Sequence, residues 1–406
     1  MSSPVAAKSN FLKLFLATAT GLLYYFSNPK PYVYYDYTFR IAENLLRGRI
    51  GLTEQPPSWL NEMIGFENLF YSAFPLGSVL TMLPFACLKA IGVIDGYPAG
   101  FVAALTAGLI CLFLILIAQS YDLTAHKKAL LVLAILFGTW MWTNLMMAGA
   151  WHVALGLTVL GEAGAIYFAV VRRNAFLTGC FFALAFGNRT EVLLIAPLFA
   201  FLLVRAPQSE FKSLESKKVI VRNLILFCFA PFILGVLTLT YNYVRFHSPT
   251  DFGYARIPGV LDEPWYRYGI FALAYVPLNF QEMLLTLWKR LPDYPYLVPT
   301  GFGGAIWLTS PFLLFLLRWQ ARRPVIHRIS WLAMIALTFL LWIHGNPGGW
   351  QFSYRYATVL LPWIFIILLE NSAPRITPSE WLAYGYSIFI NGWATYLFFW
   401  TDYVKP

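Results

Sequence analysis

The most constraining feature of this sequence is the recurrence of apolar runs long enough to cross a lipid bilayer. A membrane-spanning helix needs about 20 mostly apolar residues to cross about 30 Å of hydrocarbon. In the 406-residue chain 59% of the residues are hydrophobic and 12% are charged, which is about half the charged fraction of a soluble domain. The sequence therefore predicts an all-α polytopic membrane protein, with residues 1–406 forming a single integral membrane domain.

About 11 segments have the length and composition of a span. They are residues 11–27, 99–119, 129–146, 151–170, 175–187, 191–204, 221–242, 302–317, 329–343, 356–369 and 381–400. Residues 70–94 are also apolar, but Pro75, Gly77 and Pro84 interrupt them. Proline and glycine both disfavour a helix interior, so a second criterion is needed for this segment.

The basic residues supply that criterion, because short loops on the cytoplasmic side of a membrane are enriched in lysine and arginine. If residues 70–94 do not cross, most of the basic short-loop residues fall on one side: Lys8, Lys13, Lys127, Lys128, Arg172, Arg173, Arg205, Lys212, Lys217, Lys218, Arg222, Arg318, Arg322, Arg323, Arg328 and Arg375. We therefore expect residues 70–94 to form an interfacial or re-entrant helix, with the N-terminus cytoplasmic and the C-terminus outside. The net charge of +10 follows from this distribution, and no nucleic-acid partner is needed to explain it.

The first outer loop, residues 28–98, carries an acidic residue directly after the first span. Asp36 precedes residues 38–47, which place apolar and charged side chains on opposite faces of a helix. This pattern predicts a helix lying along the membrane surface. Acidic residues frequently cap helix starts, so Asp36 is either a cap or a residue with a chemical role.

Most other polar groups also fall on the outer side in this topology. They are Glu67, Asn144, His152, the turn 188–191, the loop 244–300 and the stretch 345–356. Polar groups that converge beside lipid predict a site for an amphiphilic ligand. The loop 244–300 is too long and too aromatic for a simple connector, and we expect it to act as a lid over this face.

Five stretches follow one another in a recognisable order. They are the Asp36 loop with its surface helix, Tyr71-Ser-Ala-Phe-Pro-Leu-Gly77, Gly187-Asn-Arg-Thr-Glu191, Asn242-Tyr-Val-Arg-Phe-His-Ser-Pro-Thr-Asp-Phe-Gly253 and Gly349-Trp-Gln-Phe-Ser-Tyr-Arg-Tyr356. In order and spacing, over residues 20–370, they resemble the lipid-linked-sugar glycosyltransferases of the GT-C superfamily. The resemblance is narrower to the bacterial branch related to protein O-mannosyltransferases and aminoarabinose transferases.

This resemblance implies a polyprenyl-phosphate-linked sugar as donor, and a lipid, a glycan or a protein as acceptor. It also implies a multi-pass protein of the bacterial inner (plasma) membrane, with its active site extracytoplasmic. Asp36 matches the catalytic base of the family, and residues 38–47 and 70–94 match its two juxtamembrane helices. The chain departs from the family in the tyrosines that flank Asp36 and in the reduced element that begins at Glu67.

Sugar transfer from a lipid phosphate requires particular side chains. A general base must accept the proton of the attacking hydroxyl, and fixed cations must stabilise the departing phosphate. Arginine suits the second task because its planar guanidinium pairs with two phosphate oxygens. Arg189, Arg245 and Arg355 are predicted at the outer ends of spans, where arginine is also a common snorkelling anchor. Secondary candidates are Arg40, Glu67, His152, Tyr354, Arg256 and Arg267.

Two other classes remain open from the residues: a protein that binds or flips lipid-linked sugars, and a secondary transporter, both without transferase chemistry. A transporter predicts internal repeats and charged midplane residues, and we find only Glu162, which we expect to pair between helices. No cofactor and no metal-ligand cluster is predicted, although Asp36 and Glu67 leave a shared divalent cation open. The residues identify neither the sugar nor the acceptor.

Overall fold

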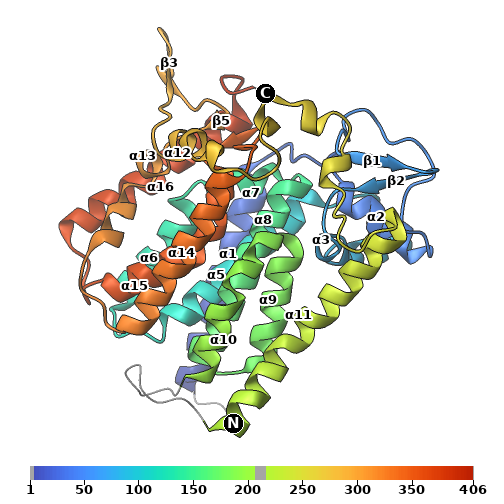
Figure 1. Cartoon of the computed structure of the whole chain (residues 1–406). Coiled ribbons are helices and arrows are strands. Elements are labelled where there is room, and N and C mark those ends of the chain that lie inside the picture. The colour runs from blue at the N-terminus through green and yellow to red at the C-terminus, as the bar shows by residue number, and fades with distance from the viewer. Residues whose placement is uncertain (1–3, 206–215, 406) are drawn as a thin grey trace.

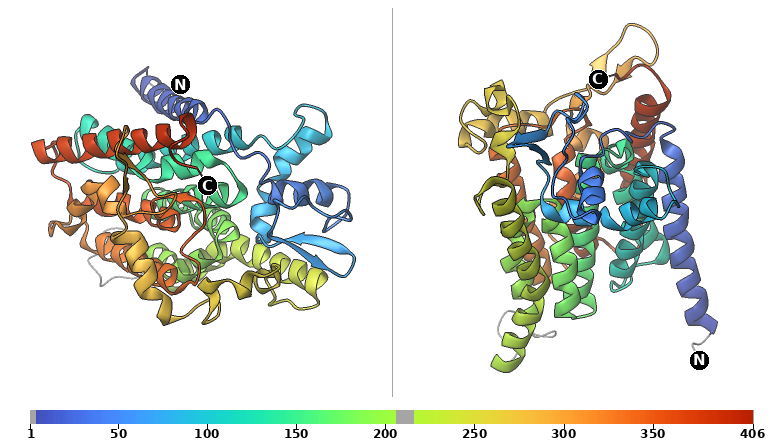
Figure 2. Two further views of the ribbon diagram at one scale, coloured as in Figure 1. Left: turned by 90° about the horizontal axis from the view of Figure 1, so that it is seen from above. Right: turned by 90° about the vertical axis from the view of Figure 1, so that its right-hand side faces the viewer.

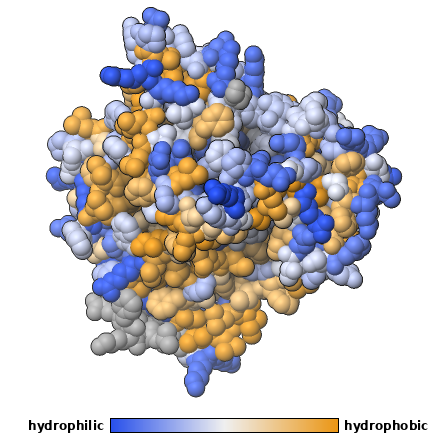
Figure 3. Space-filling view, turned by 45° about the horizontal axis from the view of Figure 1, so that its top comes forward, coloured by the Kyte–Doolittle hydropathy of each residue, from blue (hydrophilic) through white to orange (hydrophobic). Residues whose placement is uncertain are grey.

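The computed structural model describes residues 4–205 and 216–405 as a bundle of helices, with both long loops folded over one end (Figure 1). The N-terminus lies at the opposite end of the bundle from these loops, and the C-terminus lies among them (Figure 1). Lys212, which was expected in a cytoplasmic loop, lies outside the described residues. Figure 3 shows hydrophilic residues gathered over the loop-covered end and hydrophobic residues covering much of the sides below it.

The bundle consists of helices whose sequences are apolar over most of their length. They are α1 Pro4–Ser27, α5 Ala99–Ala118, α6 Ala125–Phe137, α7 Met141–Met147, α8 Ala150–Ile166, α9 Ala175–Asn188, α10 Ala196–Val204, α11 Lys217–Phe246, α14 Pro324–Ile343, α15 Leu361–Asn371 and α16 Pro378–Trp400. Helices that are apolar on every side are typical of membrane spans and of the cores of large proteins. Inside the bundle, Trp363 on α15 donates to Glu162 Oε1 on α8 at 3.0 Å, which confirms the expected pairing between helices.

Among the described residues, four helices are long and apolar enough to cross a membrane: Ala99–Ala118, Ala150–Val171, Lys217–Phe246 and Pro324–Ile343. A fifth span is present if α6 and α7, which are bent by 47° at a short break, are counted together. The structure therefore supports a membrane protein with spanning helices, but it does not confirm the expected number of about 11.

Several expected spans are instead broken into short pieces. Residues 302–317 contain α13 Ile306–Thr309 and the 3₁₀ helix η7 Pro311–Leu317, and residues 191–204 contain the 3₁₀ helix η2 Thr190–Ile195 before α10. The segment 356–369 likewise divides into η8 Arg355–Leu360 and α15. A proline stands at the first or second position of η7, α10 and α15, where its missing N–H and fixed φ favour a new helix start.

The loop of residues 28–98 contains one expected helix and one unexpected hairpin. The helix predicted over residues 38–47 is confirmed as α2 Tyr37–Leu46. Strands β1 Met63–Phe66 and β2 Leu69–Ser72 form an antiparallel hairpin, which four-residue strands gave too short a pattern to predict. The helix expected within residues 70–94 is present over Leu76–Ala90 and is divided by a turn at residues 81–82. Pro75 precedes its first part, α3 Leu76–Leu80, and Pro84 lies at the start of its second part, α4 Leu83–Ala90.

The loop 244–300 is largely irregular and packs against this hairpin. It contains four single 3₁₀ turns, the helix α12 Val276–Leu284, and the short strands β3 Lys289–Arg290 and β4 Leu297–Val298. The four turns are η3 Tyr254–Arg256, η4 Val260–Asp262, η5 Pro264–Tyr266 and η6 Leu273–Tyr275. A second hydrophobic cluster joins loop and hairpin through Ile64, Tyr71, Phe246, Ile257, Val260 and Tyr266. A last pair of strands, β5 Phe302–Gly303 and β6 Gln351–Phe352, runs parallel next to the bundle end.

The outer loop is held against the bundle by close glycine packing. A Cβ on Gly77 in α3 would lie 2.4 Å from the Cα of Gly187 in α9, so no larger residue fits there. Small residues allow helices in membranes to approach this closely. Seen from above, the elements of residues 28–98 lie at one side of the molecule and α15 and α16 at the other (Figure 2). The ends of α8 and α9 lie between them.

Candidate active site

A cavity of about 770 Å³ opens at the end of the bundle that the two long loops cover. Its wall is built from four parts of the chain: residues 62–75, the ends of α8 and α9 at 151–154 and 188–191, residues 248–271, and residues 340–356. This volume lies within the range of about 300–1,000 Å³ that small-molecule sites have. The wall combines charged side chains with apolar ones such as Ile270, Phe271 and Leu340. The cavity therefore suits an amphiphilic ligand.

Two of the three predicted phosphate ligands meet in this cavity. The guanidinium carbon of Arg189 lies 5.0 Å from the centroid of the Tyr356 ring, and that of Arg355 lies 5.1 Å from the same centroid. Arg189 follows the last residue of α9, and Arg355 begins η8. Arg189 pairs with Glu191, with 2.6 Å between Nε and Oε1. Two guanidinium groups at one ring repel each other unless negative charge lies between or beside them.

Of the two arginines, Arg355 is the one whose positive charge is less offset by neighbouring groups. Its side chain is buried, and its contacts are long: Nη1 donates to the Trp350 carbonyl at 3.3 Å and Nη2 to the Tyr356 hydroxyl at 3.4 Å. Its Nε has no hydrogen-bond partner. Within residues 4–205 and 216–405, no carboxylate lies within ion-pair distance of it. Because buried charges are normally paired, an anionic ligand in the cavity would complete this site.

A carboxylate that the sequence analysis did not select, Glu62, also lines the cavity. The indole Nε1 of Trp151 donates to Glu62 Oε2 at 2.6 Å. Burial raises the pKa of Glu62, while the Trp151 hydrogen bond and the positive charge of Arg355 oppose that rise. Glu62 precedes β1 within an irregular segment, and only its acidic character and its place in the first outer loop signalled it in the sequence. Of the carboxylates in the cavity wall, Glu62 is the one best suited to act as a general base.

Asp36, the predicted general base, lies directly before α2. It does not line the cavity, and it makes no side-chain capping bond to α2. Its Oδ1 accepts from Arg40 Nε at 2.6 Å, and burial raises the pKa of Asp36 against the opposing effect of Arg40. The neighbouring rings of Tyr35 and Tyr37 lie 4.9 and 5.1 Å from that of Trp151, which does line the cavity. Asp36 is therefore linked to the cavity through aromatic packing and does not face it.

Arg245, which was predicted as a third phosphate ligand, does not line the cavity. Its Nη1 donates to the Ser72 carbonyl at 2.8 Å, and its Nη2 donates to Asn242 Oδ1 at 2.7 Å. The guanidinium stacks on the rings of Tyr241 and Phe246 and is almost fully buried. These contacts join the end of α11 to the hairpin, so the side chain has a structural position.

The remaining secondary candidates lie elsewhere at the end of the bundle that the two long loops cover. Glu67 lies in the exposed hairpin turn, where its Oε1 is 2.9 Å from His247 Nε2. Arg256 pairs with Asp251 at 2.6 Å, and of these two only Asp251 lines the cavity. Tyr354 is buried and donates to Asn279 Oδ1 at 2.9 Å.

The last two secondary candidates differ in their exposure to solvent, since one is exposed and the other is buried. Arg267 is exposed beside the ring of Tyr268. His152, in the first turn of α8, is buried, and neither of its ring nitrogens has a hydrogen-bond partner. Neither side chain lines the cavity.

His344 is a second lining residue that the sequence analysis missed. Its Nδ1 lies 2.9 Å from the Asn346 carbonyl oxygen, which can only accept, so Nδ1 carries the proton. Burial lowers the pKa of His344, and the nearby charge of Arg189 lowers it further. The ring is therefore neutral near pH 7 and keeps Nε2 as an acceptor.

The structure brings together no group of three or more histidine, cysteine or acidic side chains that could hold a metal ion within the described ranges. The divalent cation left open for Asp36 and Glu67 gains no shared site, since Asp36 pairs with Arg40 and Glu67 with His247. No family model, curated protein or solved structure matches the chain. The resemblance to GT-C enzymes therefore rests on the residues alone.

Proposed function

We propose that this chain is an inverting membrane glycosyltransferase that transfers a sugar from a polyprenyl-phosphate donor to an acceptor hydroxyl in the cavity. The observation that supports this proposal is the meeting of Arg189 and Arg355 at Tyr356, in a cavity that also contains Glu62. In this proposal the chain crosses a bacterial plasma membrane about 11 times, counting the shorter apolar segments as spans. Its N-terminus is cytoplasmic, and the cavity is extracytoplasmic.

The donor would bind with its phosphate between the two guanidinium groups. Arg355 lacks a carboxylate partner in the described chain, so the phosphate would supply the missing negative charge. The first isoprene units would lie against Ile270, Phe271 and Leu340 on the apolar part of the wall. The sugar would then point toward Glu62 and Trp151, where an aromatic ring is available for stacking.

In the transfer step, the acceptor oxygen forms a bond to the anomeric carbon of the sugar. The bond from that carbon to the phosphate oxygen breaks, and the phosphate leaves with the bonding pair. Glu62 would accept the hydroxyl proton, and Arg189 and Arg355 would stabilise the charge on the departing phosphate. A single displacement inverts the anomeric centre and needs one base, unlike the two-carboxylate chemistry of glycoside hydrolases. Asp36 is the alternative base that the family resemblance implies.

A test uses the purified protein in nanodiscs with several radiolabelled polyprenyl-phosphate sugars and an acceptor extract. We expect one donor to be consumed by the wild type, and Glu62→Gln to abolish transfer while donor binding persists. Loss in Asp36→Asn with full activity in Glu62→Gln would assign the base to Asp36 and contradict our assignment. If donor binds but none is consumed, the transferase proposal fails, and the second candidate, a protein that binds or flips lipid-linked sugars, remains. That candidate needs only the two arginines and no base.

A further inference from the structure

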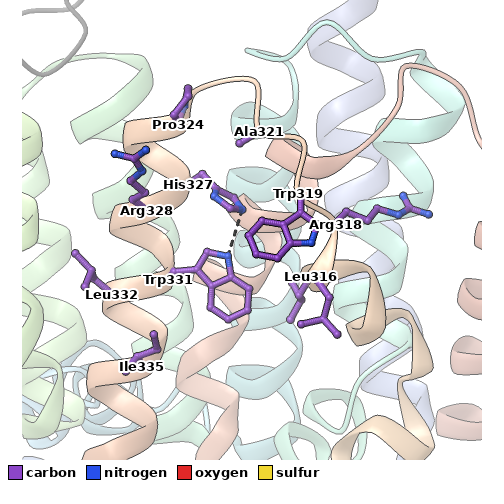
Figure 4. Close-up of a pocket in the computed structure, with 11 residues that line it drawn as sticks. Leu316, Arg318, Trp319, Ala321, Pro324, His327, Arg328, Trp331, Leu332 and Ile335 are labelled. Atoms are coloured by element: carbon purple, nitrogen blue, oxygen red, sulfur yellow. Dashed lines mark hydrogen bonds between the residues drawn. The ribbon is translucent and has the colours of Figure 1, made fainter.

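A second cavity, of about 840 Å³, lies at the opposite end of α14 from the candidate active site. The candidate active site includes Leu340 and Leu341 near the end of α14, whereas the second cavity includes residues 324–335 near its start. Its other wall is the segment 316–321, which begins at the end of η7 (Figure 4). Because an α-helix rises about 1.5 Å per residue, Pro324 at the start of the second cavity lies about 24 Å along α14 from Leu340.

The lining of this second cavity changes from polar to apolar along α14. Arg328 and His327 lie toward its start, and Leu332 and Ile335 lie further along the helix (Figure 4). Trp319 and Trp331 lie between these two parts, and Trp331 Nε1 donates to His327 Nε2 at 3.2 Å. Among the residues that the structure describes, its lining includes two arginines, Arg318 and Arg328, and no acidic residue. An amphiphile with a negative head fits this order of side chains.

The walls of the second cavity face the membrane. Trp319 is 97% exposed, and Leu332 and Ile335 are 56% and 58% exposed, which is too apolar a surface to face water. Only 33% of the most apolar 18-residue stretch of α14 is buried inside the protein. Tryptophan is enriched at the boundary between hydrocarbon and headgroups. The cavity mouth therefore lies at the headgroup level of the leaflet next to the N-terminus of the protein.

We propose that this cavity binds an anionic phospholipid of that leaflet. Its headgroup would lie beside Arg328, and an acyl chain would follow Trp331, Leu332 and Ile335. Arg318, which pairs with Glu380, and Arg328 together form the basic rim that would select a negative headgroup. The exposed apolar side chains beside the two arginines favour a lipid as the occupant, because a soluble anion would leave them uncovered. This site is separate from the donor site, and the proposal does not depend on glycosyl transfer.

Native mass spectrometry of the purified full-length protein would measure retention of phosphatidylglycerol and of phosphatidylcholine with identical acyl chains. We expect preferential retention of phosphatidylglycerol, and a loss of about fivefold in that preference for Arg328→Gln. The control is Arg322→Gln, which changes a neighbouring exposed arginine that does not line the cavity. Equal retention of the two lipids, or an equal loss in both variants, would overturn the proposal by indicating unspecific charge attraction.

A fluorescence measurement covers the case in which Arg328→Gln does not fold. Phosphatidylglycerol brominated on its acyl chain should quench the wild type more than brominated phosphatidylcholine does. Replacing both tryptophans of the second cavity, Trp319→Phe together with Trp331→Phe, should remove this extra quenching, because both indoles lie there. Persistence of the full difference in this double variant would exclude the cavity as the binding site.

Discussion

At the scale of single residues, the candidate site depends on one buried cation without a counter-ion. Arg355 has only long contacts to Trp350 and Tyr356, and its Nε has no partner. Holding a guanidinium in this state is costly, since desolvation is not offset by a carboxylate. A bound phosphate would convert this unfavourable arrangement into a strong bidentate contact. The residues around Arg355 therefore form a site prepared for an anion.

Replacing Arg355 tests this directly. We expect Arg355→Gln to weaken binding of a polyprenyl phosphate by about 30-fold or more, because truncating one partner of a buried charged contact costs about 2–5 kcal/mol. Binding is measured by the displacement of a fluorescent polyprenyl phosphate. The matched control is Arg267→Gln, which removes an exposed arginine outside the cavity wall and should leave affinity unchanged. Equal affinities of the Arg355 variant and the wild type would remove Arg355 from the phosphate site.

The raised pKa of Glu62 predicts the pH dependence of transfer. As a base, Glu62 is active only when ionised, so kcat/KM should rise with pH through a pKa above the ordinary value of 4.5. If Glu62 is the base, Asp36→Asn should keep this rise of kcat/KM with pH. If Asp36 is the base, the rise should be absent in Asp36→Asn. The comparison needs rates of the wild type and of Asp36→Asn from about pH 4 to pH 8, a range that covers the ordinary and raised carboxyl pKa values.

The same shift predicts an effect on stability. Because burial raises the pKa of Glu62 in the folded protein, the folded state retains a proton that the unfolded state has lost. The free energy of unfolding should therefore fall as pH increases from the ordinary carboxyl value through the raised one. Thermal melting of Glu62→Gln in detergent should depend less on pH in that window than melting of the wild type. Identical pH dependence in the two proteins would contradict the raised pKa.

At the scale of elements, close packing of short helices sets the shape of the cavity. Gly77 in α3 lies against Gly187 in α9, and the cavity residues Asn188 and Arg189 follow immediately. On the other side of the same contact, Phe74 and Pro75 line the cavity just before α3. The distance between these two walls is therefore fixed by a contact that contains no side chains.

We expect Gly77→Ala to separate α3 from α9 and to destabilise the protein by about 1–3 kcal/mol, the usual cost of overpacking. It should also lower donor affinity, because Arg189 moves with the end of α9. The control is Gly235→Ala in α11, whose added Cβ would meet no atom within 4 Å. Melting temperature in detergent and donor affinity are the two measurements. Wild-type values for Gly77→Ala in both would show that this contact does not set the cavity shape.

Elements also differ in how well the sequence anticipated them. The helix α2 was predictable because its apolar and charged residues repeat with helical spacing over ten residues. The hairpin β1–β2 was not, because each strand has four residues and its stability comes from the hydrophobic cluster that it shares with residues 257–266. The two helices within 70–94 and the breaks in 191–204 and 302–317 follow from prolines at helix starts. The prolines can be read from the sequence, but composition alone does not show whether a helix resumes or ends at each of them.

At the scale of the whole molecule, buried ion pairs hold the end opposite the candidate active site together. Glu380 in α16 pairs with Lys127 in α6 and with Arg318 after η7, and the side chains of Lys127 and Glu380 are completely buried. Glu370 in α15 pairs with Arg323 and accepts from Tyr121 at 2.7 Å. The contacts of Lys127 with Glu380 and of Tyr121 with Glu370 join segments more than 200 residues apart in the sequence. They stabilise the bundle at the end where the proposed lipid site lies.

Removing the charge of Glu380 should therefore affect the whole fold. Glu380→Gln leaves Lys127 buried without a counter-charge, and breaking a buried pair in this way costs about 3–5 kcal/mol. We expect a clear fall in the fraction of protein that stays monodisperse after heating in detergent. The exposed pair of Lys405 and Asp402 provides the control, and Asp402→Asn should have no measurable effect. A similar response of both variants would argue against a structural role for the Glu380 pairs.

The sequence by itself determined that the chain is a helical membrane protein, where its apolar helices lie, and that Arg189 and Arg355 belong to one polar end. These conclusions follow from composition and helical periodicity, which are local properties of the chain. Only the tertiary structure decided that Glu62 faces the cavity, that Asp36 pairs with Arg40 and that Arg245 is buried in packing. The direction of a side chain in an irregular loop depends on what packs against its neighbours, here Tyr35 and Tyr37 against Trp151. That information is distributed over segments more than 100 residues apart and is not contained in any local pattern.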